Sequence, residues 1–192
     1  MKYPKRMSSG RYIDLSDIKR EDIILSDIVT SINHLFRFTG HYDKRKPLTV
    51  GQHSLMCMRL AEEAGESSEV QLACLVHDFA EAYVGDVSTP LKRLMGKHWI
   101  DFASPIEALV DEVCLPFENT VDMHHVVKMY DLMALDIERR CMWNNRGKDM
   151  WPDVPKSYGK HKKMVKIFSG VQGYGFDTPI EQNYHRLILE VT

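Results

Sequence analysis

Apolar residues recur every three or four positions along most of the chain, the spacing that gives a helix one face for packing against a core. Glycine and proline interrupt this pattern between segments, and no run alternates polar and apolar residues over the length of a strand. The predicted fold class is therefore all-α, a compact bundle of about seven to nine helices. The expected helices cover roughly residues 22–36, 50–64, 69–84, 91–95, 104–113, 121–143 and 180–191.

The ends of these segments carry their own signals. Gly65 follows the second segment as an expected C-cap, and Gly85 is expected to end the third. Residues 11–15 are expected to form a short extended piece ahead of the first helix. No internal repeat divides the chain, so residues 1–192 are expected to form a single domain.

Composition and charge narrow the function classes. With a net charge of −2, the chain has no basic excess for holding a nucleic-acid polymer, whereas a small phosphorylated ligand needs only a local basic cluster. No window approaches the ~18 consecutive apolar residues of a membrane-spanning helix, and residues 1–6 lack a signal peptide's apolar stretch. The four cysteines form no CxxC pair and are expected to be reduced core thiols. These features indicate a cytoplasmic protein without a membrane partner.

The segment from His77 to Asp86 concentrates polar chemistry in an apolar context. His77 and Asp78 are adjacent, and Glu81 follows four and three residues later, which on a continuous helix places it on the same side as both. Asp86 comes directly after Gly85. Burying such groups unpaired costs several kcal/mol each, and a divalent cation is the simplest compensation.

A single histidine on an apolar helix is more often a hydrogen-bonded core residue than a ligand, so the metal hypothesis depends on two further residues. His53 begins the preceding helix, and Asp131 lies on the long helix expected over 121–143. Two His and two Asp suit a divalent ion such as Zn²⁺, Co²⁺, Mn²⁺, Fe²⁺ or Mg²⁺. Asp136 is the alternative to Asp131, but five residues turn a helix by about 140°, so both cannot face one ion.

These residues belong to an ordered set of longer motifs. The segments are Arg37-Phe38-x-Gly40-His41, Val50-x-Gln52-His53-Ser54, His77-Asp78-x-Ala80-Glu81-x-Tyr83-x-Gly85-Asp86-Val87-x-x-Pro90-Leu91-Lys92 and Lys128-x-x-Asp131-x-x-Ala134-x-x-x-Glu138-Arg139-Arg140. The set resembles the HD-domain phosphohydrolase superfamily, and within it the branch of bacterial 5′-deoxynucleotidases and phage dATP triphosphohydrolases. The similarity covers roughly residues 11–145.

The resemblance implies a role for each matching residue. The positions of the family's metal ligands are occupied by His53, His77, Asp78 and Asp131. Glu81 matches the catalytic carboxylate, and Asp86 matches a position beside the substrate sugar or beside a second metal such as Mg²⁺. The positions that contact phosphates are occupied by Arg37, Lys92 and Lys128. Phe38 either stacks on a base or packs inside.

The function that this resemblance implies is hydrolysis of deoxynucleotides by a homo-oligomeric, metal-dependent enzyme. The first expectation is a dATP-preferring triphosphohydrolase that releases the deoxynucleoside and triphosphate, and the near alternative is a 5′-deoxynucleotidase acting on monophosphates. A (p)ppGpp or cyclic-nucleotide hydrolase and a non-catalytic nucleotide-binding module rank lower. The basic loop Lys44-Arg45-Lys46 favours longer phosphate tails if it faces the pocket, and residues 143–177 match no motif.

Overall fold

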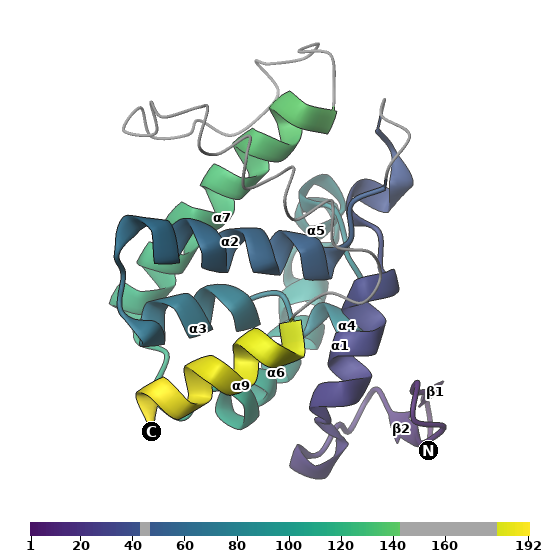
Figure 1. Ribbon diagram of the computed structural model, residues 1–192. Coiled ribbons are helices and arrows are strands. Elements are labelled where there is room, and N and C mark those ends of the chain that lie inside the picture. The colour runs from purple at the N-terminus through teal and green to yellow at the C-terminus, as the bar shows by residue number, and fades with distance from the viewer. Residues whose placement is uncertain (43–46, 143–179) are drawn as a thin grey trace.

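The helices that the apolar spacing predicts are present in the computed structural model, which describes residues 1–42, 47–142 and 180–192 (Figure 1). The described part of the chain is mainly helical, which confirms the all-α class. Its elements are β1 (Pro4–Arg6), β2 (Tyr12–Asp14), η1 (Arg20–Asp22), α1 (Leu25–His34), η2 (Arg37–Gly40), α2 (Val50–Ala64), α3 (Ser68–Val76), α4 (Glu81–Val84), α5 (Thr89–Met95), α6 (Lys97–Cys114), α7 (Val121–Met142) and α9 (Ile180–Val191).

Helix α2 lies at the centre of the fold, in contact with α1, α3 and α7, while α9 packs against α3 and α1 (Figure 1). Its first turn is fixed by a reciprocal cap: the Thr49 hydroxyl accepts the Gln52 N–H at 3.1 Å, and the Gln52 side chain accepts the Thr49 N–H at 3.0 Å. Gly65 ends the helix in the left-handed conformation, with φ of 80°. These ends confirm the predicted bounds of the helix, residues 50–64. They could be predicted because each end is set by residues next to it in the sequence.

The single helix predicted over residues 69–84 is wrong. Helix α3 ends at Val76, and α4 begins at Glu81 after a tight turn in which the Phe79 N–H donates to the Val76 carbonyl at 2.8 Å. Phe79 and Ala80 are buried in this turn, as they would be on a continuous helix. Apolar spacing therefore does not distinguish the two geometries over so few residues.

Two further elements differ from the expectation. The extended piece expected near residues 11–15 is strand β2, which pairs antiparallel with β1 and places Lys5 opposite Ile13. Helix α6 begins at Lys97 rather than near residue 104, and it continues through Pro105 in its interior. An interior proline removes one backbone hydrogen bond, and packing can outweigh that loss.

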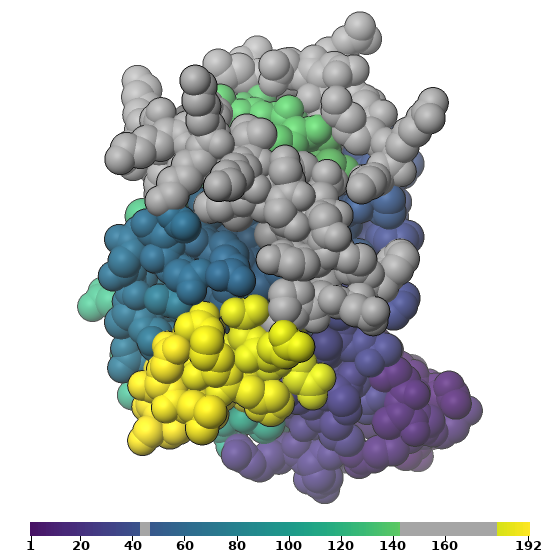
Figure 2. Space-filling view, viewed as in Figure 1, coloured from purple at the N-terminus to yellow at the C-terminus, as the bar shows by residue number. Residues whose placement is uncertain are grey.

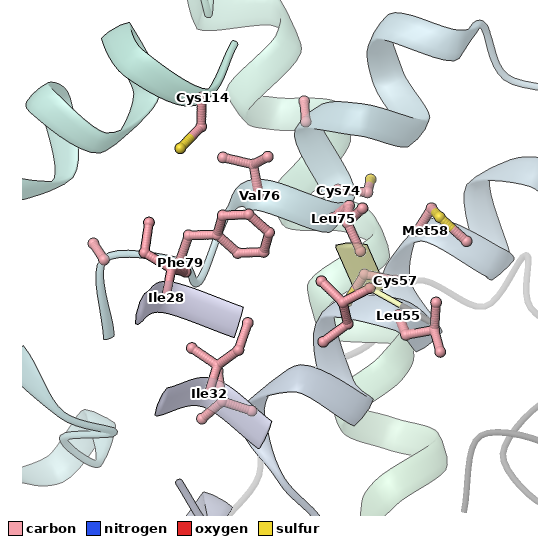
Figure 3. Packing of buried hydrophobic residues seen from close by; sticks show 14 of the residues in the cluster. Ile28, Ile32, Leu55, Cys57, Met58, Cys74, Leu75, Val76, Phe79 and Cys114 are labelled. Carbon is pink, nitrogen blue, oxygen red and sulfur yellow. The ribbon is translucent and has the colours of Figure 1, made fainter. Parts of the chain in front are cut away.

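The core is formed where α1, α2 and α3 meet. Figure 3 shows Ile28 and Ile32 of α1 and Leu55 of α2 in one cluster with Phe79, and all four are buried. Three of the four free cysteines, Cys57, Cys74 and Cys114, are buried, and Cys141 is partly buried. In the space-filling view, α9 lies as the yellow helix beside the blue residues of α2 and α3 (Figure 2). Among the described helices, none combines the length and the apolar character that a membrane span requires.

The N-terminal hairpin is tied to α1 and α4 by polar contacts. Asp27 of α1 accepts hydrogen bonds from the Ser8 hydroxyl at 2.6 Å and from the Ser9 hydroxyl at 2.8 Å. Lys5 Nζ donates to the carbonyls of Ala82 at 2.8 Å and Tyr83 at 2.7 Å. The hairpin thereby supplies partners to the last carbonyls of α4.

Asp27 gives the first prediction. Burial alone would raise its pKa, but the hydrogen bonds from Ser8 and Ser9 outweigh burial and hold the pKa below the ordinary value. Asp27→Ala is expected to lower the free energy of unfolding by about 2 kcal/mol at neutral pH. Because the folded pKa is depressed, this difference should shrink as the pH falls below about 4. Urea unfolding at pH 7 and pH 3 measures it; the exposed Asp17→Ala is the control, and a difference that grows in acid would contradict the prediction.

Gly51 gives the second prediction. A Cβ atom at this position would lie 2.4 Å from Asn33 Oδ1 and 2.7 Å from Ile180 Cδ1. Gly51→Ala is therefore expected to destabilise the fold by about 1 kcal/mol or more, although alanine is the better helix former. In thermal unfolding, Gly51→Ala combined with Ile180→Val, which lacks the clashing Cδ1, should cost less than the sum of the two single changes. Simple additivity would mean that the contact with Ile180 carries no strain.

Candidate metal centre

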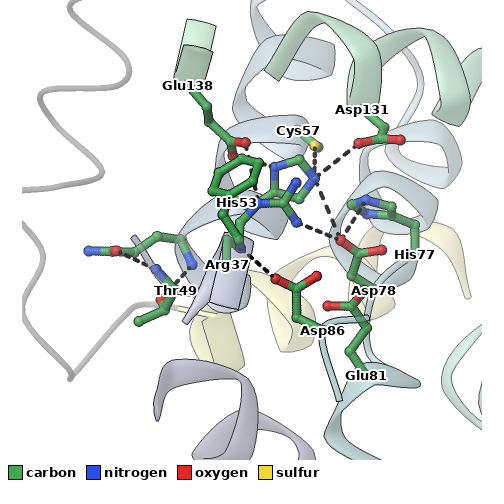
Figure 4. A network of polar contacts seen from close by, with 12 residues as sticks. Arg37, Thr49, His53, Cys57, His77, Asp78, Glu81, Asp86, Asp131 and Glu138 are labelled. Atoms are coloured by element: carbon green, nitrogen blue, oxygen red, sulfur yellow. Dashed lines mark hydrogen bonds and ion pairs between the residues drawn. The ribbon is translucent and has the colours of Figure 1, made fainter. Parts of the chain in front are cut away.

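Three separate elements bring the four predicted metal ligands together. His53 Nε2 on α2 lies 3.2 Å from Asp131 Oδ1 on α7 and 3.6 Å from Asp78 Oδ2 in the turn after α3 (Figure 4). His77 Nε2 lies 3.3 Å from the same Asp78 oxygen. Two ring nitrogens and two carboxylates thus face one small volume, as a single divalent ion requires.

Each histidine is oriented by an acceptor at its other ring nitrogen. His53 Nδ1 lies 2.6 Å from Glu138 Oε1, and His77 Nδ1 lies 2.8 Å from the Cys74 carbonyl. Both acceptors lack a hydrogen to give, so each Nδ1 donates and each Nε2 faces the centre. His77 Nε2 is buried without a hydrogen-bond partner in the described part of the chain. A buried nitrogen that makes no hydrogen bond and lies 3.3 Å from the Asp78 carboxylate fits a metal ligand.

The electrostatics of the centre favour a positive charge beside His53. Burial and Arg37 lower the pKa of His53, but the carboxylates of Glu138 and Asp131 outweigh them and raise this pKa well above its ordinary value. Burial alone would raise the pKa of Asp131, yet the hydrogen bond and charge of His53 hold it well below the ordinary range. The pKa of Asp78 is likewise held low by His77, His53 and Arg37. The negative charge that attracts a proton to this volume equally attracts a cation.

Glu81 lies beside the centre, and its pKa is shifted in the opposite direction to those of Asp78 and Asp131. Burial, followed by the nearby charges of Asp78 and Asp86, raises the pKa of Glu81 well above its ordinary value. Burial also raises the pKa of Asp86. Glu81 Oε2 is buried and has no hydrogen-bond partner among the described residues. Glu81 is therefore able to hold a proton beside carboxylates that remain charged.

The segment that carries Arg37 and Phe38 is held against the centre by Asp86. Phe38 and Thr39 both adopt left-handed backbone angles, with φ of 56° and 55°, which non-glycine residues rarely do. The Phe38 N–H donates to Asp86 Oδ2 at 2.9 Å, and this bond helps to hold the strained turn. The Phe38 ring is partly buried, with the Arg37 guanidinium 5.2 Å from its centroid.

The basic residues expected to contact phosphates are paired with carboxylates in the structure. Arg37 is buried, with Nη1 3.3 Å from Asp78 Oδ2 and Nε 3.3 Å from Glu138 Oε2. Lys128 pairs with Asp131, although 65% of its side chain is exposed. Lys92 lies 3.8 Å from Glu81 Oε1. The basic loop over 44–46 lies outside the described residues, as does the segment 143–177.

Asp136, the alternative to Asp131, is engaged elsewhere. Its carboxylate pairs with Arg139 at 2.7 Å and with Arg140 at 2.6 Å. These contacts turn the Asp136 carboxylate towards the two arginines. His124 and His125 are exposed near the start of α7.

The structure adds Cys57 and Glu138, to which the sequence analysis gave no role in the centre. Cys57 Sγ lies 3.5 Å from His53 Nε2, and Cys57, His53 and His77 offer a second donor set whose atoms lie within 4.8 Å of one another. Cys57 follows His53 by four residues, and Glu138 follows Asp131 by seven, so helical spacing was the available signal in both cases. Glu138 is completely buried, a rare state for a glutamate without a partner.

A cavity of about 270 Å³ opens beside the centre. His77, Asp78 and Asp131 line one side of it, while Glu107 and Asp111 of α6 line the other. Burial raises the pKa of both α6 carboxyls. A small molecule can therefore reach His77, Asp78 and Asp131 from the α6–α7 side, whereas His53 is fully buried behind them.

Comparison with known proteins agrees with this geometry. Residues 50–149 match the HD domain family. The chain is also similar to the uncharacterised protein YfdR of Escherichia coli, at 31% identity over 144 residues that cover 75% of this chain and 74% of that protein. A second relative, the uncharacterised protein RCAP_rcc00048 of Rhodobacter capsulatus, is 30% identical over 137 residues, 70% of each chain. HD domains bind divalent metals and act as metal-dependent hydrolases. With most of its centre inside the matched range, the chain belongs to the HD domain family.

Proposed function

We propose that this protein is a metal-dependent phosphohydrolase of deoxynucleotides whose cation is held by His53, His77, Asp78 and Asp131. The observation that carries the proposal is the convergence of these side chains from α2, the turn after α3, and α7 upon one volume. His77 Nε2 supports it, because this buried nitrogen makes no hydrogen bond among the described residues and lies 3.3 Å from the Asp78 carboxylate, and burying such a nitrogen is costly without a ligand.

The chemistry follows from what surrounds this volume. A divalent cation, when bound, neutralises charge on phosphoryl oxygens and lowers the pKa of water. Glu81, with its raised pKa, holds or accepts a proton and orients the attacking water. Arg37 fixes Asp78 in place. Lys92 pairs with Glu81, and Lys128 pairs with Asp131. Both side chains are long and flexible, so each ammonium group can turn from its carboxylate towards a phosphate of the substrate.

The leading substrate within this proposal is a deoxynucleoside triphosphate, dATP in particular, with cleavage between the 5′-oxygen and the α-phosphorus. Its support is the resemblance to the branch that contains both the phage dATP triphosphohydrolases and the 5′-deoxynucleotidases. The Gly85-Asp86-Val87-x-x-Pro90-Leu91-Lys92 stretch indicates this branch rather than a (p)ppGpp or cyclic-nucleotide hydrolase. One observation favours the alternative, a 5′-deoxynucleotidase. Glu107 and Asp111 line the cavity beside the centre, and their negative charge disfavours a long phosphate tail there.

A substrate panel tests the function. Purified protein is incubated with each dNTP, dNMP and NTP in the presence of Mg²⁺, Mn²⁺, Co²⁺ or Zn²⁺, and the products are separated by chromatography. The expected products from dATP are deoxyadenosine and triphosphate. Release of single phosphates from dNMPs alone would select the nucleotidase alternative. No turnover of any nucleotide with any of the four ions would remove the proposal.

Matched variants test which donors hold the cation. Asp78→Ala is expected to lower both metal content and activity at least 100-fold, because it removes one ligand and one of the two carboxylates that pair with the buried Arg37. Asp122→Ala, an exposed carboxylate in the first turn of α7, should change neither. Cys57→Ser should keep Mn²⁺ binding within about threefold, because hard ions prefer the carboxylate set. Metal loss in Cys57→Ser with retention in Asp78→Ala would instead assign the site to His53, Cys57 and His77.

A further inference from the structure

We propose that Glu138 is a positioning residue that makes His53 a metal ligand, by holding the hydrogen of its ring on Nδ1 and fixing the ring plane. The inference rests on the proposed metal site and adds a requirement to it. The Glu138 carboxylate meets the Nδ1 side of the His53 ring, whereas Asp78 and Asp131 meet the Nε2 side (Figure 4).

Each oxygen of the Glu138 carboxylate contacts a residue of the centre, one His53 and the other Arg37. Oε1 lies 2.6 Å from His53 Nδ1, and Oε2 lies 3.3 Å from Arg37 Nε. Glu138 and His53 have no exposed surface. Solvent therefore does not replace the acceptor that Glu138 provides.

The chemical requirement follows from imidazole itself. A neutral ring carries one hydrogen, and it binds a cation through the nitrogen that lacks it. Only an acceptor at Nδ1 keeps the hydrogen there and leaves the Nε2 lone pair directed at the centre. Two carboxylates at the Nε2 side would otherwise draw the hydrogen towards themselves.

Arg37 extends the same support to a second ligand. Its guanidinium contacts Glu138 through Nε and Asp78 through Nη1, both at 3.3 Å. One buried carboxylate on α7 thus governs the ring of His53 on α2 directly and the carboxylate of Asp78 through one arginine. Glu138 also lies two helical turns after Asp131, so α7 supplies a ligand and the group that orients another.

The experiment compares three variants of the full chain, Glu138→Gln, Glu138→Asp and Glu138→Ala. Metal-stripped protein is titrated with Co²⁺, and affinity is read from calorimetry and from the visible Co²⁺ spectrum. The Nδ1–H proton of His53 is observed by NMR in Zn²⁺-loaded protein. Glu138→Ala is expected to weaken Co²⁺ binding 10- to 100-fold and to remove the Nδ1–H signal. Glu138→Gln, which keeps an acceptor oxygen, should recover part of the affinity.

Asp136→Ala is the matched control, because it removes a carboxylate from the same helix and leaves the buried Arg139 without that partner. Asp136→Ala should leave the Co²⁺ affinity and the His53 Nδ1–H signal unchanged. If loss of any carboxylate partner on α7 loosened the helix and weakened the site, this variant would also lose Co²⁺ affinity. Wild-type Co²⁺ affinity with an intact Nδ1–H signal in Glu138→Ala would overturn the inference. If that variant does not fold, the same result in a fourth variant, Glu138→Met, which has a similar size and no acceptor oxygen, would do so. The proposed metal site fails separately, if Asp78→Ala binds Co²⁺ as the wild type does.

Discussion

The main constraint on the structure is the burial of the His53 imidazole within the central helix α2. His53 lies within the buried stretch of α2, with carboxylate oxygens from α7 at both ring nitrogens and the Asp78 carboxylate near Nε2. A polar ring at such a depth is tolerated only when both nitrogens are satisfied. Helix α7 must therefore run beside α2 at a fixed register, and the turn after α3 must present Asp78 from the other side.

The charges of this region explain why a cation suits it. Asp78, Asp131 and Glu138 approach His53 closely, and the buried guanidinium of Arg37 contacts two of these three carboxylates. Arginine attracts carboxylates but cannot sit among all of them, because its planar fork reaches Asp78 and Glu138 and leaves Asp131 to His53 and Lys128. A divalent ion at the point where the histidines and aspartates meet relieves the remaining repulsion.

Features set by neighbouring residues could be predicted from the sequence, and features set by distant residues could not. Thr49 and Gly65 define α2 through local hydrogen bonds and a local backbone angle, so its bounds were correct. The break after Val76 was missed because burial of Phe79 is compatible with a helix and with a turn. The residues that meet at His53 were identified through a family pattern, but Glu138 acquires its role from a contact across 85 positions of the chain. The seven-residue spacing from Asp131 places Glu138 on the same face of α7, but it does not show which residue of α2 that face meets.

The N-terminal hairpin takes on a different meaning once Glu81 is placed at the centre. Lys5 closes the far end of the same four-residue helix that Glu81 opens, through bonds to Ala82 and Tyr83. So short a helix has little internal rigidity, and its anchorage comes from outside. A pull on the first strand, from a fused tag for example, is therefore transmitted through Lys5 to α4, whose first residue is Glu81, the group proposed to hold a proton.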